Sequence, residues 1–153
     1  MAFTRSYPIQ FRDTDAAGVL YFANGLALCH AAYEDSLQSA GFDLRDFFSA
    51  SARLAYPIVH ASMDYHRPLH CGDLVRITLH PRRLDAFSFE ITYHLALNAE
   101  VDAEPESKAN RPLAEALTRH TCIETQPRRR HPLPTGMEQW LHRWESPDQG
   151  SDQ

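Results

Sequence analysis

The hydrophobic residues of this chain change their spacing once, near residue 51, from a helical period to an alternating one. The larger apolar residues before that point recur every three or four positions: Leu26, Cys29, Tyr33 and Leu37. This spacing predicts a helix over residues 24–40, with Asn24 as its N-cap and Gly41 as the residue that ends it. Alanines keep much of the remaining helix surface small, so we expect protein to surround this helix.

The alternation after residue 51 predicts a run of strands, and it is cleanest over residues 87–98. One face of that strand is entirely apolar: Phe87, Phe89, Ile91, Tyr93, Leu95 and Leu97. The spacing as a whole predicts strands over residues 6–12, 56–67, 73–84, 87–98 and 113–125, a short helix within 43–51 and a loop over 99–111. One long helix followed by consecutive strands indicates the α+β class with an antiparallel sheet.

The length and composition suit one folded domain. The chain has 153 residues, of which 43% are hydrophobic and 23% charged, so it can bury a core of its own. We assign this domain to residues 1–126 and a C-terminal extension to residues 127–153. Within the extension we expect a short helix over residues 137–144 and a disordered tail from residue 146.

Charge and cysteine content exclude several classes of protein. A net charge of −5 does not suit a general nucleic-acid binder. No apolar run approaches the ~20 residues of a membrane helix, and residues 1–6 lack the apolar segment of an export signal. Cys29, Cys71 and Cys122 are odd in number and widely spaced, which predicts neither a disulfide framework nor a zinc site. We therefore expect a cytoplasmic protein that binds neither nucleic acid nor membrane.

The stretch with the most chemical content is residues 11–24, FRDTDAAGVLYFAN. Asp15 lies in a loop of small residues directly before the predicted helix, whose N-terminus presents unpaired N–H groups. Gly18 allows a ligand to approach the backbone closely. A carboxylate beside an oxyanion-binding N–H is sufficient equipment for acyl transfer to water. A helix cap in an ordinary turn is the alternative, and on the residues alone it is the commoner case.

The same stretch resembles the signature of the 4-hydroxybenzoyl-CoA thioesterase family. The matching residues are Asp13, Asp15, Gly18, Val19, Leu20, Tyr21, Phe22 and Asn24. The similarity extends over residues 5–126, and through Tyr33-Glu34 and residues 63–69 it is closest to the branch that acts on 1,4-dihydroxy-2-naphthoyl-CoA in phylloquinone biosynthesis. It implies a hotdog fold, an antiparallel sheet wrapped around one long central helix, and hydrolysis of an aromatic acyl-CoA. The alternative substrate is 4-hydroxybenzoyl-CoA or another aryl or short acyl-CoA.

Carried over by position, the resemblance assigns two catalytic groups. The family's catalytic carboxylate falls on Asp15, either as a nucleophile or as a base that activates water. The backbone N–H that polarises the thioester carbonyl falls on Phe22. Asp13 is expected to order the loop. The rings of Tyr21 and Phe22 either bound the acyl pocket or pack into the core.

The resemblance also implies the assembly and the partners. It predicts a homotetramer, built as a dimer of dimers with active sites at the dimer interface, that takes an acyl-CoA substrate and needs no metal or organic cofactor. His60 is a candidate for an acyl pocket lined by a neighbouring subunit. Two basic clusters either contact the CoA phosphates or are simply solvated: Arg82 and Arg83, and Arg128, Arg129 and Arg130.

Other side chains allow weaker hypotheses. His30 and Glu34 are four residues apart on the helix and form either an acid–base pair or a structural hydrogen bond. His60, Asp64 and His66 share one face of a strand, but their spacing matches no standard metal site. A hotdog dehydratase would need a different histidine–carboxylate pair. A non-catalytic acyl-CoA sensor would not require Asp15 and would normally carry a DNA-binding appendage.

Overall fold

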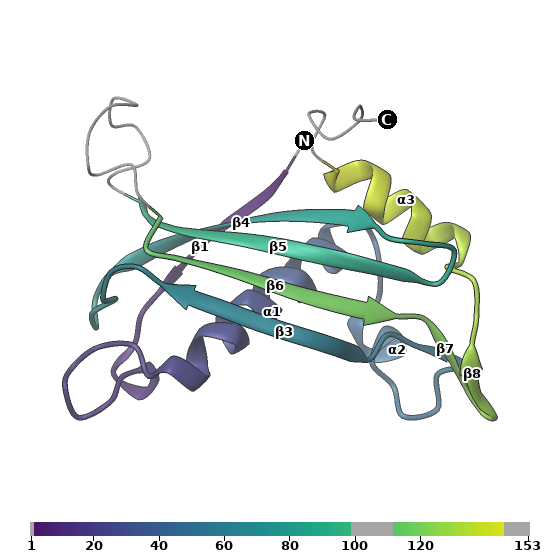
Figure 1. Cartoon of the computed structure of the whole chain (residues 1–153), viewed down its shortest axis with the longest axis horizontal. Helices are drawn as coiled ribbons and strands as arrows, with labels where there is room; N and C mark the ends of the chain where they lie inside the picture. Colours follow the sequence, from purple (N-terminus) through teal and green to yellow (C-terminus); the bar gives the residue numbers. More distant parts are fainter. Residues whose placement is uncertain (1, 99–111, 146–153) are drawn as a thin grey trace.

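The computed structural model describes residues 2–98 and 112–145, and its main feature is a five-stranded antiparallel sheet (Figure 1). The strands lie across the sheet in the order β1 (Phe3–Pro8), β4 (Leu74–Arg83), β5 (Ser88–Leu97), β6 (Ala114–Thr121) and β3 (Ile58–Tyr65). The long helix α1 (Phe22–Ser39) lies behind this sheet in the view of Figure 1. This arrangement confirms the predicted α+β hotdog fold. The predicted loop over 99–111 and the predicted tail from residue 146 lie outside the described residues.

The core lies between the sheet and α1. Alternate residues of a strand face the same side, and the inward set of β4 and β5 is fully buried: Val75, Ile77, Leu79, Phe89, Ile91, Tyr93 and Leu95. Helix α1 buries its own stripe against them: Gly25, Cys29, Ala32, Tyr33, Ser36 and Leu37. Other positions of the helix, such as Ala27, stay exposed. A single chain therefore covers α1 on one side rather than surrounding it.

The start of the chain differs from the prediction. The strand expected over residues 6–12 is found as β1, and residues 11–13 form a short 3₁₀ helix, η1 (Phe11–Asp13). The Asp13 carboxylate accepts a hydrogen bond from the Gln10 N–H at 2.8 Å, and this contact closes the turn. The alternation of apolar residues in the sequence does not predict this turn.

Helix α1 begins earlier than its sequence pattern indicates. Its N-cap is Tyr21, whose side chain makes no capping hydrogen bond, so the assignment of Asn24 as N-cap is wrong. Asn24 lies in the first turn, and its side-chain amide instead donates to the Asp13 carbonyl at 3.1 Å. Gly41 ends the helix as predicted, with φ +94°. The short helix α2 (Leu44–Phe47) follows, as predicted.

The strand predicted over residues 113–125 is divided. Its first part is β6, whereas its last part belongs to a separate three-stranded sheet made of β2 (Leu54–Ala55), β7 (Ile123–Thr125) and β8 (Arg128–Arg130). Buried Cys122 separates the two parts, donating its N–H to the Phe87 carbonyl and accepting from the His131 N–H. Strands β2 and β8 were not predicted, because two or three residues are too few to show a period.

The helix predicted near the C-terminus is α3 (Thr135–Trp144), and it packs against the sheet beside β4 (Figure 1). It buries four large side chains: Met137, Trp140, Leu141 and Trp144. The Trp140 indole N–H donates to the Ser36 hydroxyl of α1 at 3.1 Å. The last described helix is therefore part of the same core as α1. No helix within residues 2–98 and 112–145 is long and apolar enough to cross a membrane.

A buried histidine lies in that core. His120 is 1% exposed, and its ring stacks on Phe89 with centroids 4.7 Å apart. Its Nδ1 lies 3.4 Å from the Tyr56 carbonyl, which can only accept, and its Nε2 lies 2.9 Å from the Thr118 hydroxyl. The geometry therefore assigns a neutral ring with the proton on Nδ1. Burial lowers the pKa of His120 to about 4.

Candidate active site

The segment between η1 and α1 forms a closed loop with two antiparallel arms. The Tyr21 N–H donates to the Asp13 carbonyl and the Asp15 N–H to the Val19 carbonyl, each at 2.9 Å. Gly18 closes the turn by donating to the Asp15 carbonyl at 3.0 Å, with φ +78°, a backbone conformation that residues other than glycine rarely adopt. The loop therefore brings Asp13 beside Tyr21, the residue before α1, and places Asp15 opposite Val19, closer to the turn.

This loop is attached to the segment that follows β3. Val19 forms a β-bridge with His70, and the Leu20 N–H donates to the Leu69 carbonyl at 2.7 Å. Leu20 and Leu69 are both buried and anchor this contact in the core. The start of α1 is consequently fixed relative to the end of β3, although the two segments are distant in sequence.

The two acidic residues of the loop have different environments. The Asp13 carboxylate is used internally, in its bond to the Gln10 N–H, and thus orders the loop as expected. Asp15 accepts one hydrogen bond, from the Ala17 N–H to Oδ1 at 2.8 Å, and its side chain is exposed in the single chain. Asp15 is therefore the carboxylate of this loop that can still meet a ligand.

Phe22, the first residue of α1, lines a pocket of about 400 Å³. The N–H groups of the first helical turn lack partners within the helix, so the Phe22 amide is available as a donor. The remaining lining residues come from the loop and from the end of β3: Val19, Leu20, Tyr65, His66, Arg67, Pro68 and Leu69. Tyr65 lies within residues 63–69, which resemble the family, but its sequence context predicts no role for it. The structure brings its hydroxyl to the Phe22 carbonyl, to which it donates a hydrogen bond.

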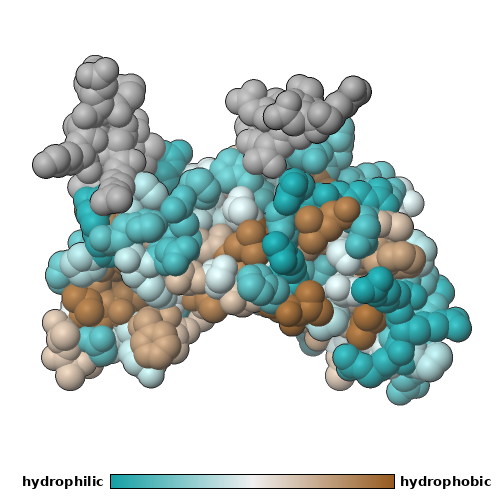
Figure 2. Space-filling view, in the orientation of Figure 1, coloured by the Kyte–Doolittle hydropathy of each residue, from teal (hydrophilic) through white to brown (hydrophobic). Residues whose placement is uncertain are grey.

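Hydrophobic side chains gather around this loop. Figure 2 shows brown surface at the lower left, where Figure 1 places the loop before α1 and the end of β3. Phe11, Tyr21 and Phe22 are 85%, 43% and 69% exposed there. The prediction that the rings of Tyr21 and Phe22 pack into the core is wrong for the single chain, because both rings are exposed. Exposed aromatic surface beside a carboxylate suits an aryl ligand or a second subunit.

The other predicted site residues do not join the loop within one chain. Figure 1 places β8 and the end of β4, which carry the five candidate arginines, at the end of the sheet opposite the loop. His60 is exposed on the edge strand β3. It lies opposite Arg119 of the neighbouring strand β6, on the face of the sheet turned away from α1. Any contribution of these residues to the Asp15 site must come from another subunit.

Three of these arginines bind carboxylates of their own chain. Arg83 Nη1 lies 2.9 Å from Glu138 of α3, and Arg129 Nε lies 2.8 Å from Glu124. Arg82 forms an ion pair with Glu90, which is 5% exposed and is also bound by Arg119 at 3.0 Å. Simple solvation therefore does not describe Arg82, Arg83 and Arg129 fully, because ion pairs hold their side chains in place.

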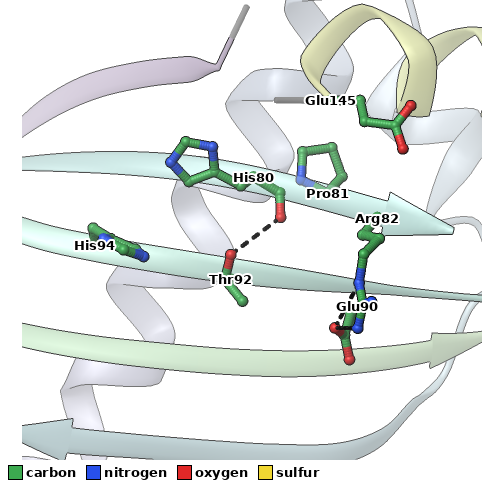
Figure 3. A pocket seen from close by; sticks show the side chains of 7 residues that line it. All are labelled: His80, Pro81, Arg82, Glu90, Thr92, His94 and Glu145. Carbon is green, nitrogen blue, oxygen red and sulfur yellow. Dashed lines mark hydrogen bonds and ion pairs between the residues drawn. The ribbon is translucent and has the colours of Figure 1, made fainter. Parts of the chain in front are cut away.

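The carboxylate of Glu90 remains charged despite its burial. Burial alone would raise the pKa of Glu90, but hydrogen bonds from Arg82 and Arg119 outweigh it and leave this pKa below its usual value. Glu90 lines a second pocket, of about 470 Å³, on the face of the sheet that points away from α1 (Figure 3). Thr92, which donates to the His80 carbonyl at 3.4 Å, also lies there, with His94 nearby. This pocket contains no residue of the Asp15 loop.

The weaker histidine hypotheses resolve into ordinary contacts. His30 Nδ1 lies 3.5 Å from Glu34, so the predicted pair meets, on a partly exposed face of α1. His66 bonds Glu115 across the sheet at 3.0 Å rather than a metal partner on its own strand. Among residues 2–98 and 112–145, no three histidine, cysteine or carboxylate side chains are placed to hold a metal ion.

Sequence comparison agrees with this architecture. A profile described as the thioesterase-like superfamily matches residues 9–141. The chain belongs to this superfamily. Its similar relatives include 1,4-dihydroxy-2-naphthoyl-CoA hydrolases from Nostoc punctiforme, 45% identical over 92% of this chain and 87% of the relative, and from Rippkaea orientalis, 47% identical over 87% and 90%.

A solved structure supports the same relationship. The 1,4-dihydroxy-2-naphthoyl-CoA thioesterase from Synechocystis is 33% identical and superposes with a TM-score of 0.81. The match covers 93% of this chain and 96% of that protein, so the shared fold includes all the main elements described above.

Proposed function

We propose that this protein hydrolyses 1,4-dihydroxy-2-naphthoyl-CoA to the free acid and CoA, a step of phylloquinone biosynthesis. The relatives named for this reaction match nearly the whole chain, which supports the substrate. The observation that carries the reaction type is the exposed carboxylate of Asp15, which lies in a closed loop directly before the first turn of α1.

The chemistry follows from these two groups. The Phe22 N–H binds the thioester oxygen and stabilises the negative charge that develops on it when the carbonyl carbon is attacked. The Asp15 carboxylate either attacks that carbon itself, forming an anhydride that water then hydrolyses, or removes a proton from the attacking water. In both routes the carbon–sulfur bond breaks, CoA leaves as a thiolate that takes up a proton, and Asp15 must start ionised.

We further propose that the active site is completed by a second copy of the chain. Strand β3 is the outer strand of the sheet, and Ile58 and Val59 on it are 44% and 64% exposed. Unpaired strand edges bind other strands readily. Antiparallel pairing of two β3 strands would place the Tyr65 end of one subunit beside the Ile58 end of its partner, and two such dimers would form the homotetramer.

This pairing gives the distant arginines a role. The Ile58 end of β3 lies near β7 and β8, so the basic β8 of one subunit would approach the Asp15 loop of the other (Figure 1). CoA carries its phosphates far from the thioester, and arginine is suited to phosphate oxygens. We also propose that the enzyme works in the cytoplasm, since Cys29, Cys71 and Cys122 are free thiols.

A thiol-release assay with a panel of aromatic and aliphatic acyl-CoAs tests the substrate. We expect the highest kcat/KM for 1,4-dihydroxy-2-naphthoyl-CoA, followed by monocyclic aryl-CoAs, with short aliphatic acyl-CoAs slowest. Equal or faster hydrolysis of an aliphatic acyl-CoA would contradict the assignment of an aryl substrate. Absence of thiol release from every member of the panel would contradict the assignment of hydrolysis.

Replacing Arg128 and Arg130 together with alanine tests the placement of CoA. Both side chains are exposed, whereas Arg129 between them is bound to Glu124 and is left unchanged. We expect KM to rise about tenfold, the effect of losing one charged hydrogen bond, with kcat little changed. The control is Arg45→Ala, at an exposed position on α2. A KM equal to that of the control would remove these two arginines from the site.

A further inference from the structure

Tyr65 joins the end of β3 to the start of α1. It is the last residue of β3, and its hydroxyl donates a hydrogen bond to the carbonyl of Phe22, 43 positions earlier in the chain. A tyrosine hydroxyl is protonated at neutral pH and able to donate, and burial raises the pKa of Tyr65 further. The contact links the edge strand to the residue whose N–H is assigned to the oxyanion.

A glycine makes this contact possible. Gly25 is buried in α1, although glycine is among the least favourable residues inside a helix. A β-carbon at this position would overlap the Tyr65 hydroxyl and would lie 2.6 Å from Met63 Sδ. The close approach of β3 to the first turns of α1 therefore explains why this helical position has no side chain.

We infer that Tyr65 is a positioning residue for the hydrolysis proposed above, holding the first turn of α1 so that the Phe22 N–H keeps its place in the pocket. The inference rests on the proposed function. An oxyanion is stabilised only when its donor lies at hydrogen-bond distance from the developing charge. The first turn of a helix is where fraying occurs, and the hydroxyl ties that turn to a strand of the central sheet.

Tyr65→Phe is the direct test, because it removes the hydroxyl and leaves the ring. We expect kcat to fall about 10- to 100-fold, the effect of a donor misplaced by up to ~1 Å, with KM changed less than about twofold. The matched control is Tyr7→Phe. The Tyr7 hydroxyl also bonds α1, at Asp35, but far along the helix from the pocket. We expect kcat of this control to stay within about twofold of the unmodified protein.

Gly25→Ala tests the same contact by changing the helix instead of the strand. The added methyl group displaces the Tyr65 hydroxyl, so we expect a similar loss of kcat. Adding Tyr65→Phe to this variant should then cost little more, because the hydrogen bond is already broken. With thermal unfolding curves showing that both single variants are folded, losses that multiply in the double variant would show that the two residues act separately and would overturn the inference.

A spectroscopic measurement separates positioning from a merely structural role. In the Asp15→Asn protein, bound 4-hydroxybenzoyl-CoA labelled with ¹³C at the thioester carbonyl should show a lowered carbonyl stretching frequency, caused by the Phe22 N–H. Adding Tyr65→Phe should reduce that shift. If the carbonyl frequency is the same with and without Tyr65→Phe, the inference about Tyr65 is overturned but the proposed function is not. The same holds if Tyr65→Phe keeps the kcat of the unmodified protein while Asp15→Asn is inactive. Failure of the unmodified protein to hydrolyse any aryl-CoA overturns the proposed function and the inference with it.

Discussion

Replacing Asp15 with asparagine is expected to lower kcat at least about 10²- to 10⁴-fold, the range typical of the loss of a general base. Asparagine keeps the shape of the side chain, and its carbonyl oxygen can still accept the hydrogen bond from the Ala17 N–H. The loop should therefore persist while the negative charge disappears. Turnover of a saturating aryl-CoA, measured beside a thermal unfolding curve, checks both halves of this expectation.

The matched control for this variant is Asp43→Asn. Asp43 caps α2, where asparagine serves as well as aspartate, and it lies outside the pocket beside Phe22. We expect the control to keep its activity within about twofold. Asp15→Asn with near-native turnover would defeat the assignment of Asp15 as the catalytic carboxylate.

Acidification is expected to destabilise the protein through His120. The pKa of this histidine is about 4 in the folded protein and 6.5 when unfolded, so between these values the unfolded chain binds more protons. Stability from this group is fully present above pH 6.5 and is lost as the pH falls toward 4. At 1.36 kcal/mol per pKa unit, the free energy of unfolding should fall by about 3 kcal/mol over this window.

Urea unfolding between pH 7.5 and 4.5, at a fixed protein concentration, measures this effect. His120→Gln provides the comparison, because glutamine can hydrogen-bond to Thr118 but does not titrate. We expect the variant to be less stable at pH 7.5 and to lose less stability on acidification than the unmodified protein. Parallel pH profiles for the two proteins would show that other groups, such as the carboxylates, cause the acid sensitivity.

The sequence predicts the fold best where one period continues for many residues. The alternation around Ile91 and Tyr93 predicted β5 within one residue at each end, and the apolar stripe of α1 predicted that helix within two. The errors lie where a local contact overrides the pattern. The capping function expected of Asn24 fails because its amide binds Asp13, and the strand break at Cys122 is invisible because the alternation continues past it.

The candidate site was only partly predictable. Asp15 and Phe22 belong to one continuous motif, so the sequence places both near the start of α1. Tyr65 reaches Phe22 through the stacking of β3 against the helix, and no local pattern encodes a contact between residues 43 positions apart. Arg83 shows the same difficulty, because the carboxylate that binds it, Glu138, comes from α3, a distant element.

The hydrogen bond between Trp140 and Ser36 spans 104 positions of the chain, and it has a consequence for synthesis on the ribosome. Until α3 emerges, Tyr33 and Phe89 lack the indole ring that packs against both of them. A nascent chain that stops short of residue 135 should therefore stay open to proteases and chaperones, whereas one that includes residue 144 should close.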